Sequence, residues 1–316
     1  MLNRHFLRAK VLQLLYAFQI NDCSDTDGHK KKLIDSFRYL VDLQTYLFSA
    51  LMEFHSIAYD KIDDNKQKML PTTEDLNPNL KFIENEFFKK LFEDKNLTER
   101  VKKLKINWSE EKDLFKNIFK RFIESDSYKK HMSSSMTDFA SERLIVVQLF
   151  KNYLISNEQF FDMLCEKKLE WESDYDVIAQ NALKYLKEYD GKSDIELDES
   201  FDIEFITGLF LNTINNDEYF KELIDGRIQN WDLDRIALMD VIIIKMGLAE
   251  LIYCPEIPVN VTLNEYVELA KEFSTQKSKL FVNGLLDKLM VDLRAKGKIK
   301  KIEILEADQE EEDILI

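Results

Sequence analysis

The stretch DLDRIALMDVIIIKMGLAELIYCPEIPVNVTLNEYVELAKEFSTQKSKLFVNGLLDK (residues 232–288) decides the fold class of this chain. Its apolar residues return every three or four positions, which is the spacing of one face of a helix. Pro255 and Pro258 interrupt this pattern, because a proline disfavours helical backbone at the residue before it. We therefore expect helices near 232–252, 262–274 and 278–295. Their predicted core consists of Leu269, Phe273, Val282, Leu285, Leu286 and Leu289.

The composition extends this prediction to the whole chain. Only 7 Gly and 4 Pro occur among 316 residues, whereas strand-rich folds need many turn residues. Hydrophobic residues make up 45% of the chain, which is enough for a sizeable core. The expected fold class is all-α.

Amphipathic segments occupy most of the remaining sequence. In HFLRAKVLQLLYAFQ (5–19), Leu7, Val11, Leu14, Leu15 and Phe18 form one apolar stripe, and helical spacing places Arg4, Arg8 and Tyr16 away from it. The polar run at 21–32 is expected to end this first helix, and a second helix is expected over 33–62. Further helices are expected over 80–93, 109–125, 139–155, 158–171 and 175–189. Ser109, followed by two glutamates, is the expected N-cap of one of them.

Two polar breaks suggest the domain organisation. The first, at 63–79, contains two of the prolines, and the second, at 190–202, is acidic and rich in turn residues. We expect N-terminal helices in 1–62, a helical insertion in 63–200, a C-terminal helical bundle in 201–301 and an acidic tail in 302–316.

Charge is distributed unevenly along the chain. The net charge is −15, yet residues 1–19 carry Arg4, Arg8 and Lys10 with no acid before Asp22. The segment RAKGKIKK (294–301) carries five bases, and 302–316 carries seven acids and no base. Nucleic-acid binding draws on Lys and Arg that neutralise phosphates, so a local basic patch remains compatible with RNA.

Cysteine usage and hydropathy bear on the compartment. Cys23, Cys165 and Cys254 are far apart and in no metal-ligand spacing, which is typical of free thiols in a reducing cytosol. The most apolar segment, VIIIKMGLAELIY (241–253), is interrupted by Lys245 and Glu250. It is too short and too polar for a membrane span and is expected to be a buried helix of a cytoplasmic protein.

No arrangement of residues indicates catalysis. The sequence contains no G-x-G-x-x-G loop and no G-x-S-x-G elbow, which are typical of nucleotide binding and of hydrolases. The four histidines have no Cys or carboxylate partners at metal-ligand spacing, and His55 is expected to be a hydrogen-bonded, partly buried residue. We therefore expect no catalytic residue, no metal and no cofactor.

A resemblance to a known family rests on residues of the quoted stretch, whose spacing matches the family without gaps, and on residues of the first helix. In the stretch these are Arg235, Glu250-Leu251, Pro258, Val261, Asn264-Glu265, Leu269-Ala270-Lys271, Phe273, Ser278 and Phe281–Asp287. In the first helix they are Arg8, Gln13, Leu15, Tyr16 and Gln19. These residues resemble the NusB transcription-antitermination family, over about 1–20 and 205–290.

The resemblance implies a NusB-like double helical bundle, enlarged here by the helical insertion. It implies binding of single-stranded boxA-like RNA from ribosomal-RNA transcripts, together with NusE, a small-subunit ribosomal protein. The complex would act on RNA polymerase. No chemistry is implied, so the expected function is that of a non-catalytic antitermination factor.

The resemblance also implies that the first helix and the start of the last helix lie side by side and bind RNA together. The implied RNA-binding residues are Arg4, Arg8, Lys10, Gln13 and Tyr16, with Lys277, Ser278, Lys279 and Phe281. Ser278 is the expected N-cap of the last helix, where free N–H groups suit a phosphate, and the Phe281 ring suits base stacking. Gly284 is expected to allow close helix packing. Replacing Arg8 with Glu is expected to weaken RNA binding without loss of helix content.

Alternative interpretations stay open for the same residues. Arg4 and Arg8 can be solvated charges, and Phe281 and Tyr16 can be core. Phe6 and Leu7 stand within a stretch that is richer in arginine in the family, which supports a helical protein–protein adaptor of NusB fold that does not bind RNA. A fusion with an RNA methyltransferase is disfavoured by the lack of a glycine-rich loop. Nothing in the sequence assigns a role to the insertion or to 294–301.

Overall fold

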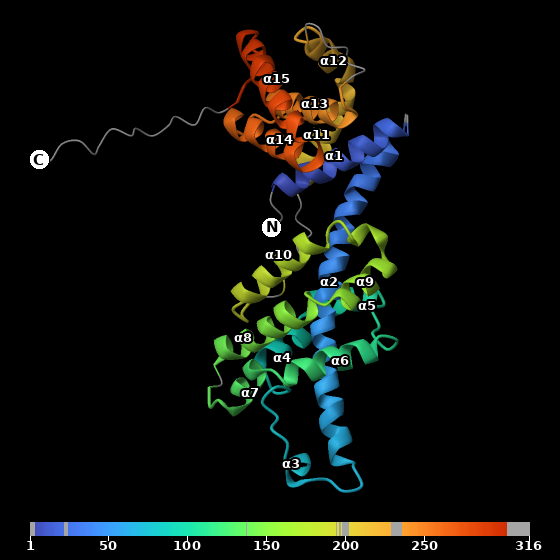
Figure 1. Cartoon of the computed structure of the whole chain (residues 1–316), viewed down its shortest axis with the longest axis vertical. Coiled ribbons are helices and arrows are strands. Elements are labelled where there is room, and N and C mark those ends of the chain that lie inside the picture. The colour runs from blue at the N-terminus through green and yellow to red at the C-terminus, as the bar shows by residue number, and fades with distance from the viewer. Residues whose placement is uncertain are drawn as a thin grey trace, which may run out of the picture. The chain divides into compact units, whose positions relative to one another are not determined.

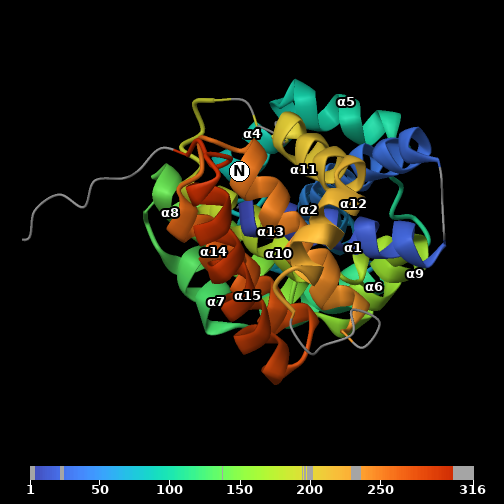
Figure 2. The same cartoon turned by 90° about the horizontal axis from the view of Figure 1, so that it is seen from above.

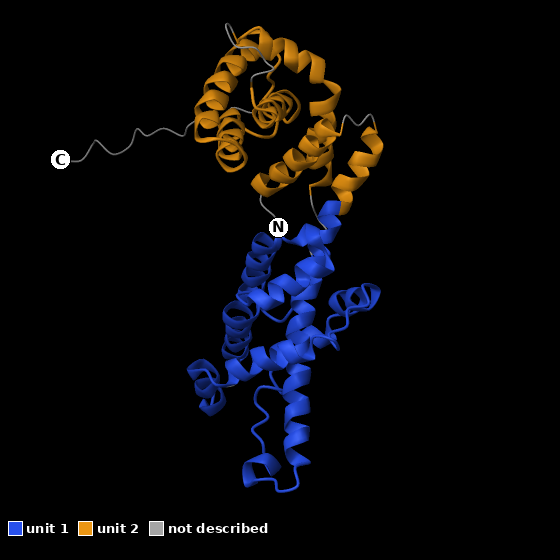
Figure 3. Ribbon diagram, turned by 45° about the vertical axis from the view of Figure 1, so that its right-hand side comes forward, with its two compact units in different colours: residues 1, 36–199 blue, residues 2–35, 200–316 orange. Residues whose placement is uncertain are grey.

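The computed structural model describes residues 4–21, 25–136, 138–193, 195, 197, 202–228 and 236–301. The described residues form helices and contain no β-strand (Figure 1), which confirms the all-α prediction. The chain divides into two compact units (Figure 3). Unit 1 comprises Met1 and Ser36–Glu199, and unit 2 comprises Leu2–Asp35 and Ser200–Ile316.

Unit 2 is a bundle around one central helix. Its elements are α1 (Arg4–Ile20), the first residues of α2 (Thr26–Lys66), α11 (Ile203–Asn215), α12 (Asp217–Asp225), α13 (Leu238–Tyr253), α14 (Val259–Phe273) and α15 (Gln276–Ala295). Helix α13 contacts α1, α11, α14 and α15 (Figure 2). Every residue from Asp240 to Leu251 is buried, because a helix that is apolar all round needs cover on all sides. The prediction of a buried helix at 241–253 is confirmed.

A glycine sets the closest approach within unit 2. A Cβ atom built on Gly247 would lie 3.0 Å from Leu286 Cδ2 and 3.4 Å from a ring carbon of Tyr266. Gly247 on α13 thus allows α14 and α15 to pack against that helix. Gly284 does not have this role, because a Cβ atom there would meet no described atom within 4 Å; our expectation for Gly284 is wrong.

Unit 1 contains the greater part of α2 and a series of shorter helices. These are α3 (Thr73–Leu76), α4 (Glu86–Glu93), α5 (Lys95–Lys103), α6 (Lys112–Ile123), α7 (Asp126–Ser133), α8 (Phe139–Leu149), the π-helix η1 (Phe150–Leu154), α9 (Glu158–Lys167), the 3-10 helix η2 (Leu169–Trp171) and α10 (Tyr175–Glu188).

Aromatic side chains fill the core of unit 1. The Phe54 ring of α2 lies 5.2 Å from that of Phe115 on α6, and the Phe82 ring lies 5.2 Å from that of Phe88. All four phenylalanines are fully buried. His55 Nε2 lies 2.8 Å from the Ile83 carbonyl oxygen, which confirms the prediction for His55. Unit 1 therefore has a hydrophobic core of its own.

Several element boundaries differ from the prediction. Helix α2 begins at Thr26, within the polar run expected to be a loop, and the short helices α5 and α7 were not predicted. Ser109 is not an N-cap, because α6 begins at Lys112 and Glu111 precedes it without a side-chain capping bond. Short charged helices lack a long apolar stripe and are therefore hard to recognise from spacing.

The unit boundaries also differ from the predicted domain boundary at 62/63. Helix α2 runs without interruption across the boundary between Asp35 and Ser36. The second boundary lies between Glu199 and Ser200, next to the acidic break at 190–202. Arg235 and the tail 302–316 lie outside the described residues.

The two glycines give a matched test of the packing in unit 2. We predict that Gly247→Val lowers the free energy of unfolding by about 1–3 kcal/mol, because the new methyl groups overpack a filled core. Gly284→Val should instead be neutral or stabilise by roughly 0.4 kcal/mol, because valine has a higher helix propensity than glycine. Urea denaturation followed by circular dichroism measures both. Equal stability of the two variants would contradict the close approach at Gly247.

Candidate nucleic-acid interface

Helix α1 packs against α13 and α11 through its inner face. Leu7, Val11, Leu12 and Leu15 are all buried on this face, as expected for residues separated by three, four or seven positions. Arg8 is also on this face, with only 1% of its surface exposed. A fully buried guanidinium requires charged or polar partners.

The partner of Arg8 is a glutamate of the central helix. Arg8 Nε donates to Glu250 Oε2 at 2.7 Å and Arg8 Nη2 donates to Glu250 Oε1 at 2.9 Å. Burial alone would lower the pKa of the Arg8 guanidinium, but the hydrogen bonds and the negative charge of Glu250 raise it above its ordinary value. Arg8 therefore stays charged, and the pair is bidentate, the strongest form of this interaction.

Two hydroxyl groups of α14 complete the shell of Glu250. Thr262 Oγ1 donates to Glu250 Oε1 and the Tyr266 hydroxyl donates to Glu250 Oε2, each at 2.9 Å. Lys301 Nζ in turn donates to Thr262 Oγ1 at 2.7 Å. Residues from α1, α13 and α14 thus meet at one carboxylate, and Lys301, after α15, reaches it through Thr262.

This network corrects the expected role of Arg8. Arg8 is not available for direct RNA contact, because its donors are directed to Glu250 and, through Nη1 at 3.2 Å, to Glu265, and its surface is buried. The sequence carried a signal for this role: Glu250 stands in the most apolar helix of the chain, and a buried carboxylate needs a cationic partner. The expectation that Arg8→Glu leaves the fold intact is therefore abandoned.

The start of α15 differs in detail from the prediction. Its N-cap is Thr275, whose Oγ1 accepts from the Ser278 backbone N–H at 3.2 Å. Ser278 is buried, and its hydroxyl lies 2.8 Å from Thr275 Oγ1. Ser278 is therefore neither the N-cap nor an exposed phosphate ligand; it holds the first turn of the helix.

The remaining predicted residues of α15 are accessible to different degrees. Lys277 is exposed, and Lys279 and Phe281 are half-buried. Among the residues that the structure describes, no carboxylate lies within 4.0 Å of the ammonium group of Lys277 or Lys279. Leu280 beside them is 74% exposed.

Hydrogen bonds bring the start of α1 close to the end of α14. His5 Nδ1 lies 3.0 Å from Glu265 Oε2, and His5 Nε2 lies 3.1 Å from Glu272 Oε2. The pKa of Glu268 is lowered, first by Lys271 and to a smaller extent by Lys279 and His5. The first turn of α1, the end of α14 and the first turn of α15 therefore surround one surface.

We call this surface the α1–α14–α15 surface and define it by Arg4, His5, Lys271, Lys277 and Lys279. Acidic side chains are interspersed among its cations. Arg4 pairs with Asp202 at 3.1 Å, and Lys271 pairs with Glu268. Lys277 and Lys279 are therefore the side chains of this surface best suited to bind an anionic ligand.

The other predicted residues of α1 lie further along that helix. Lys10 is half-buried, with Nζ 5.9 Å from the centre of the Phe6 ring, Gln13 is exposed and Tyr16 is half-buried. At 1.5 Å per residue, Gln13 lies about 13 Å along the axis from Arg4. An RNA that contacts both α15 and Gln13 would have to run along α1.

Among the residues that the structure describes, no group of three or more His, Cys, Asp or Glu residues could hold a metal ion. Within the same residues, no helix is both long and apolar enough to cross a membrane.

These features define a helical protein with a buried polar centre and a mixed-charge surface at one end of a bundle. The NusB family model matches residues 155–291. Three curated transcription antitermination proteins NusB are similar to this chain. The chain belongs to the NusB family.

The matches to these relatives are partial. The protein from Salinibacter ruber is 36% identical over 98 residues, which are 31% of this chain and 61% of that protein. The protein from Finegoldia magna is 40% identical over 28% of this chain and 65% of its own length. For Bacillus velezensis the values are 40% identity, 29% of this chain and 70% of the relative. No solved structure gives a significant match.

The buried pair makes a sharp prediction about stability. Arg8→Ala should lower the free energy of unfolding by about 3–5 kcal/mol, because it leaves the Glu250 carboxylate buried without its cation. Arg4→Ala removes an exposed pair on the same helix and should change the stability by less than about 1 kcal/mol. Denaturant unfolding measures both variants. A small effect of Arg8→Ala would show that the pair is dispensable.

Proposed function

We propose that this protein is a transcription antitermination factor that binds single-stranded RNA on the α1–α14–α15 surface and performs no chemistry. Membership of the NusB family supports the coarse role, since its relatives are named transcription antitermination proteins. The observation that carries the RNA site is the pair of lysines without carboxylate partners, Lys277 and Lys279, in the first turn of α15. Unpaired cations at a helix N-terminus suit a phosphate.

In this proposal the residues divide into contact and positioning roles. Lys277 and Lys279 bind phosphates, and Phe281 stacks on a base. Arg4, Lys10, Gln13 and Tyr16 supply further contacts along α1. Arg8 and Ser278 touch no RNA; Arg8 fixes α1 against α13, and Ser278 orders the first turn of α15.

The finer partners follow from the family resemblance. We propose boxA-like single-stranded RNA as the ligand, a NusE-type ribosomal protein as the protein partner and the RNA polymerase antitermination complex, in the cytoplasm, as the setting. These partners agree with a surface that offers few cations, since a second protein would then add affinity and specificity.

One observation favours a second candidate function. Arg4, His5 and Lys271 all lie against carboxylates, which reduces the positive charge that RNA would meet. A helical adaptor of NusB fold that binds only protein partners would have such a surface.

A matched pair of variants separates these functions. Lys277→Gln/Lys279→Gln should weaken binding of a boxA-like oligonucleotide by roughly 25-fold at 0.1 M salt, since two lost phosphate contacts change the salt slope by about 1.4 on a single strand. The control, Lys288→Gln/Lys296→Gln, removes two exposed lysines near the C-terminal end of α15. It should change the affinity for the oligonucleotide little. Fluorescence anisotropy at several salt concentrations measures both. Absence of saturable binding in the unmodified protein would favour the adaptor.

A further inference from the structure

A row of lysines lies on the outer face of α6 in unit 1. Lys112, Lys116 and Lys120 are all exposed and are spaced four residues apart. In a helix this spacing places them on one face, about 6 Å apart along the axis. We call these three residues the α6 lysine row.

The α6 lysine row differs from other lysines of unit 1 in its electrostatic surroundings. Among the described residues, no carboxylate lies within 4.0 Å of its three ammonium groups. In contrast, Lys90 pairs with Glu93 at 3.7 Å and Lys89 with Glu86 at 4.0 Å. Within the described part of the chain the three lysines are therefore free of close ion pairs, although Lys112 lies near enough to Glu53 on α2 for its charge to oppose the rise that burial causes in the pKa of that carboxyl.

Its sequence neighbourhood strengthens the positive potential. Residues 102–130 contain nine basic and five acidic residues, in a chain whose net charge is −15. Burial first, and then the charges of Lys68 and Lys120, lower the pKa of Lys61 on α2, while Glu124 opposes this effect. Lys61 thus lies close enough to Lys120 to extend the positive region from α6 to α2. Lys68 adds little to it, because its ammonium group pairs with Asp75 at 3.1 Å.

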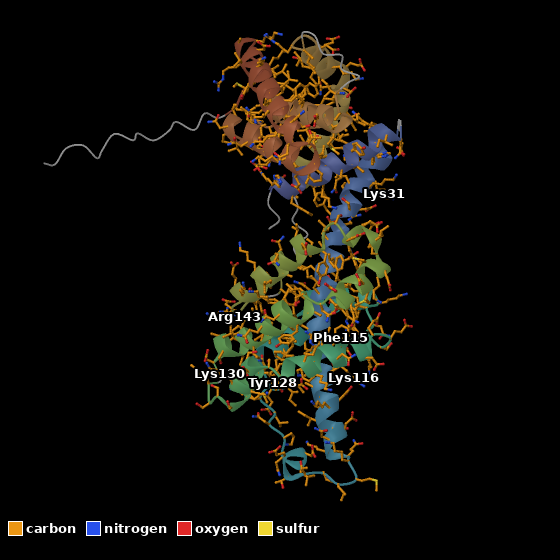
Figure 4. All side chains as sticks on the ribbon, viewed as in Figure 1. Lys31, Phe115, Lys116, Tyr128, Lys130 and Arg143 are labelled. Carbon is orange, nitrogen blue, oxygen red and sulfur yellow. The ribbon has the colours of Figure 1, made fainter. Side chains whose placement is uncertain are left out.

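The row stands on a firmly packed helix. Phe115, Ile118, Phe119 and Phe122 form the opposite face of α6, and all are buried. Figure 4 marks Phe115 and Lys116 as neighbours on this helix. Because the apolar face is used inside unit 1, it is not available for insertion into a lipid surface, which an amphipathic membrane helix requires.

The composition of the exposed face points to the kind of partner. Directly after each of the lysines, α6 exposes Asp113, Asn117 and Arg121, with no large apolar side chain. Protein interfaces depend on aromatic and apolar anchors and are depleted in lysine. Regularly spaced point charges without such anchors suit a phosphate backbone, whose binding is dominated by charge.

We propose that unit 1 binds the phosphodiester backbone of single-stranded RNA through Lys112, Lys116 and Lys120 of α6. This site is separate from the α1–α14–α15 surface and gives the enlarged part of the chain a function of its own. Binding there is independent of base sequence, because the row offers charges and no group that reads a base edge.

The test uses the full chain, a 30-nucleotide oligouridine and fluorescence anisotropy between 0.05 and 0.2 M salt. Lys116→Gln/Lys120→Gln should make the slope of log K against log salt less negative by about 1.4, and weaken binding roughly 25-fold at 0.1 M salt. The matched control, Lys89→Gln/Lys90→Gln, changes the net charge equally but removes lysines that lie beside carboxylates. It should leave slope and affinity nearly unchanged, and circular dichroism verifies the fold of each variant.

Equal effects of the two double variants would overturn the proposal, because general charge would then explain the binding. Phosphatidylserine vesicles form a second arm: loss of vesicle binding with unchanged RNA binding would identify a lipid surface instead and also overturn it. Binding of the same oligouridine to Lys277→Gln/Lys279→Gln distinguishes the α6 lysine row from the α1–α14–α15 surface. If this variant binds normally while Lys116→Gln/Lys120→Gln does not, the α6 site stands whatever the outcome for the α1–α14–α15 surface.

Discussion

The buried ion pair between Arg8 and Glu250 is the constraint on which unit 2 depends. Glu250 lies in a helix that is surrounded on all sides, and it has no exposed surface. A carboxylate in such a place is tolerated only with a cation and hydrogen-bond donors around it. Arg8, Thr262 and Tyr266 supply them, so α1 and α14 must both reach α13 at this point.

This constraint also determines the surface features of unit 2. With Arg8 fixed, His5 lies one turn earlier on α1 and reaches Glu265 and Glu272 of α14. The start of α1 is thereby held near the first turn of α15, where Lys277 and Lys279 lie. Arg8 thus contributes to the candidate RNA site by positioning its elements and not by touching a ligand.

The two residues of the pair are joined by a long intervening segment, which the bundle accommodates. Arg8 and Glu250 are separated by 242 positions in sequence, and unit 1 falls between them. The entropy of closing a loop grows only slowly with its length, and unit 1 has its own core around Phe54 and Phe115. A unit that folds on its own core need not weaken the contacts at Glu250.

The helices with long apolar stripes were predictable from the sequence, as were the core residues Leu269, Val282 and Leu286, all of which are buried. Helices α5 and α7 were not, because short charged helices depend on tertiary packing and capping more than on an apolar stripe. The burial of Arg8 was not predicted either, because the local sequence around a buried arginine does not differ from that around a solvated one, and only the position of Glu250 in three dimensions distinguishes them.

The location of the candidate site at the start of α15 was predicted, but its hydrogen bonds were not. Thr275, Lys277 and Ser278 lie within four consecutive positions of the sequence, so the location followed from the pattern. Which hydroxyl caps the helix depends on where the first turn begins, a matter of one or two hydrogen bonds that composition does not specify. The carboxylates that accompany Arg4 and His5 come from distant segments and could not be read from local sequence.

The most direct test is a double-mutant cycle on Arg8→Met and Glu250→Gln, with the free energy of unfolding measured for the two single variants, the double variant and the unmodified protein. We predict a coupling energy of about 2–3 kcal/mol, at the upper end for residues in direct contact. A coupling energy near zero would show that the two residues do not depend on each other and would contradict the account.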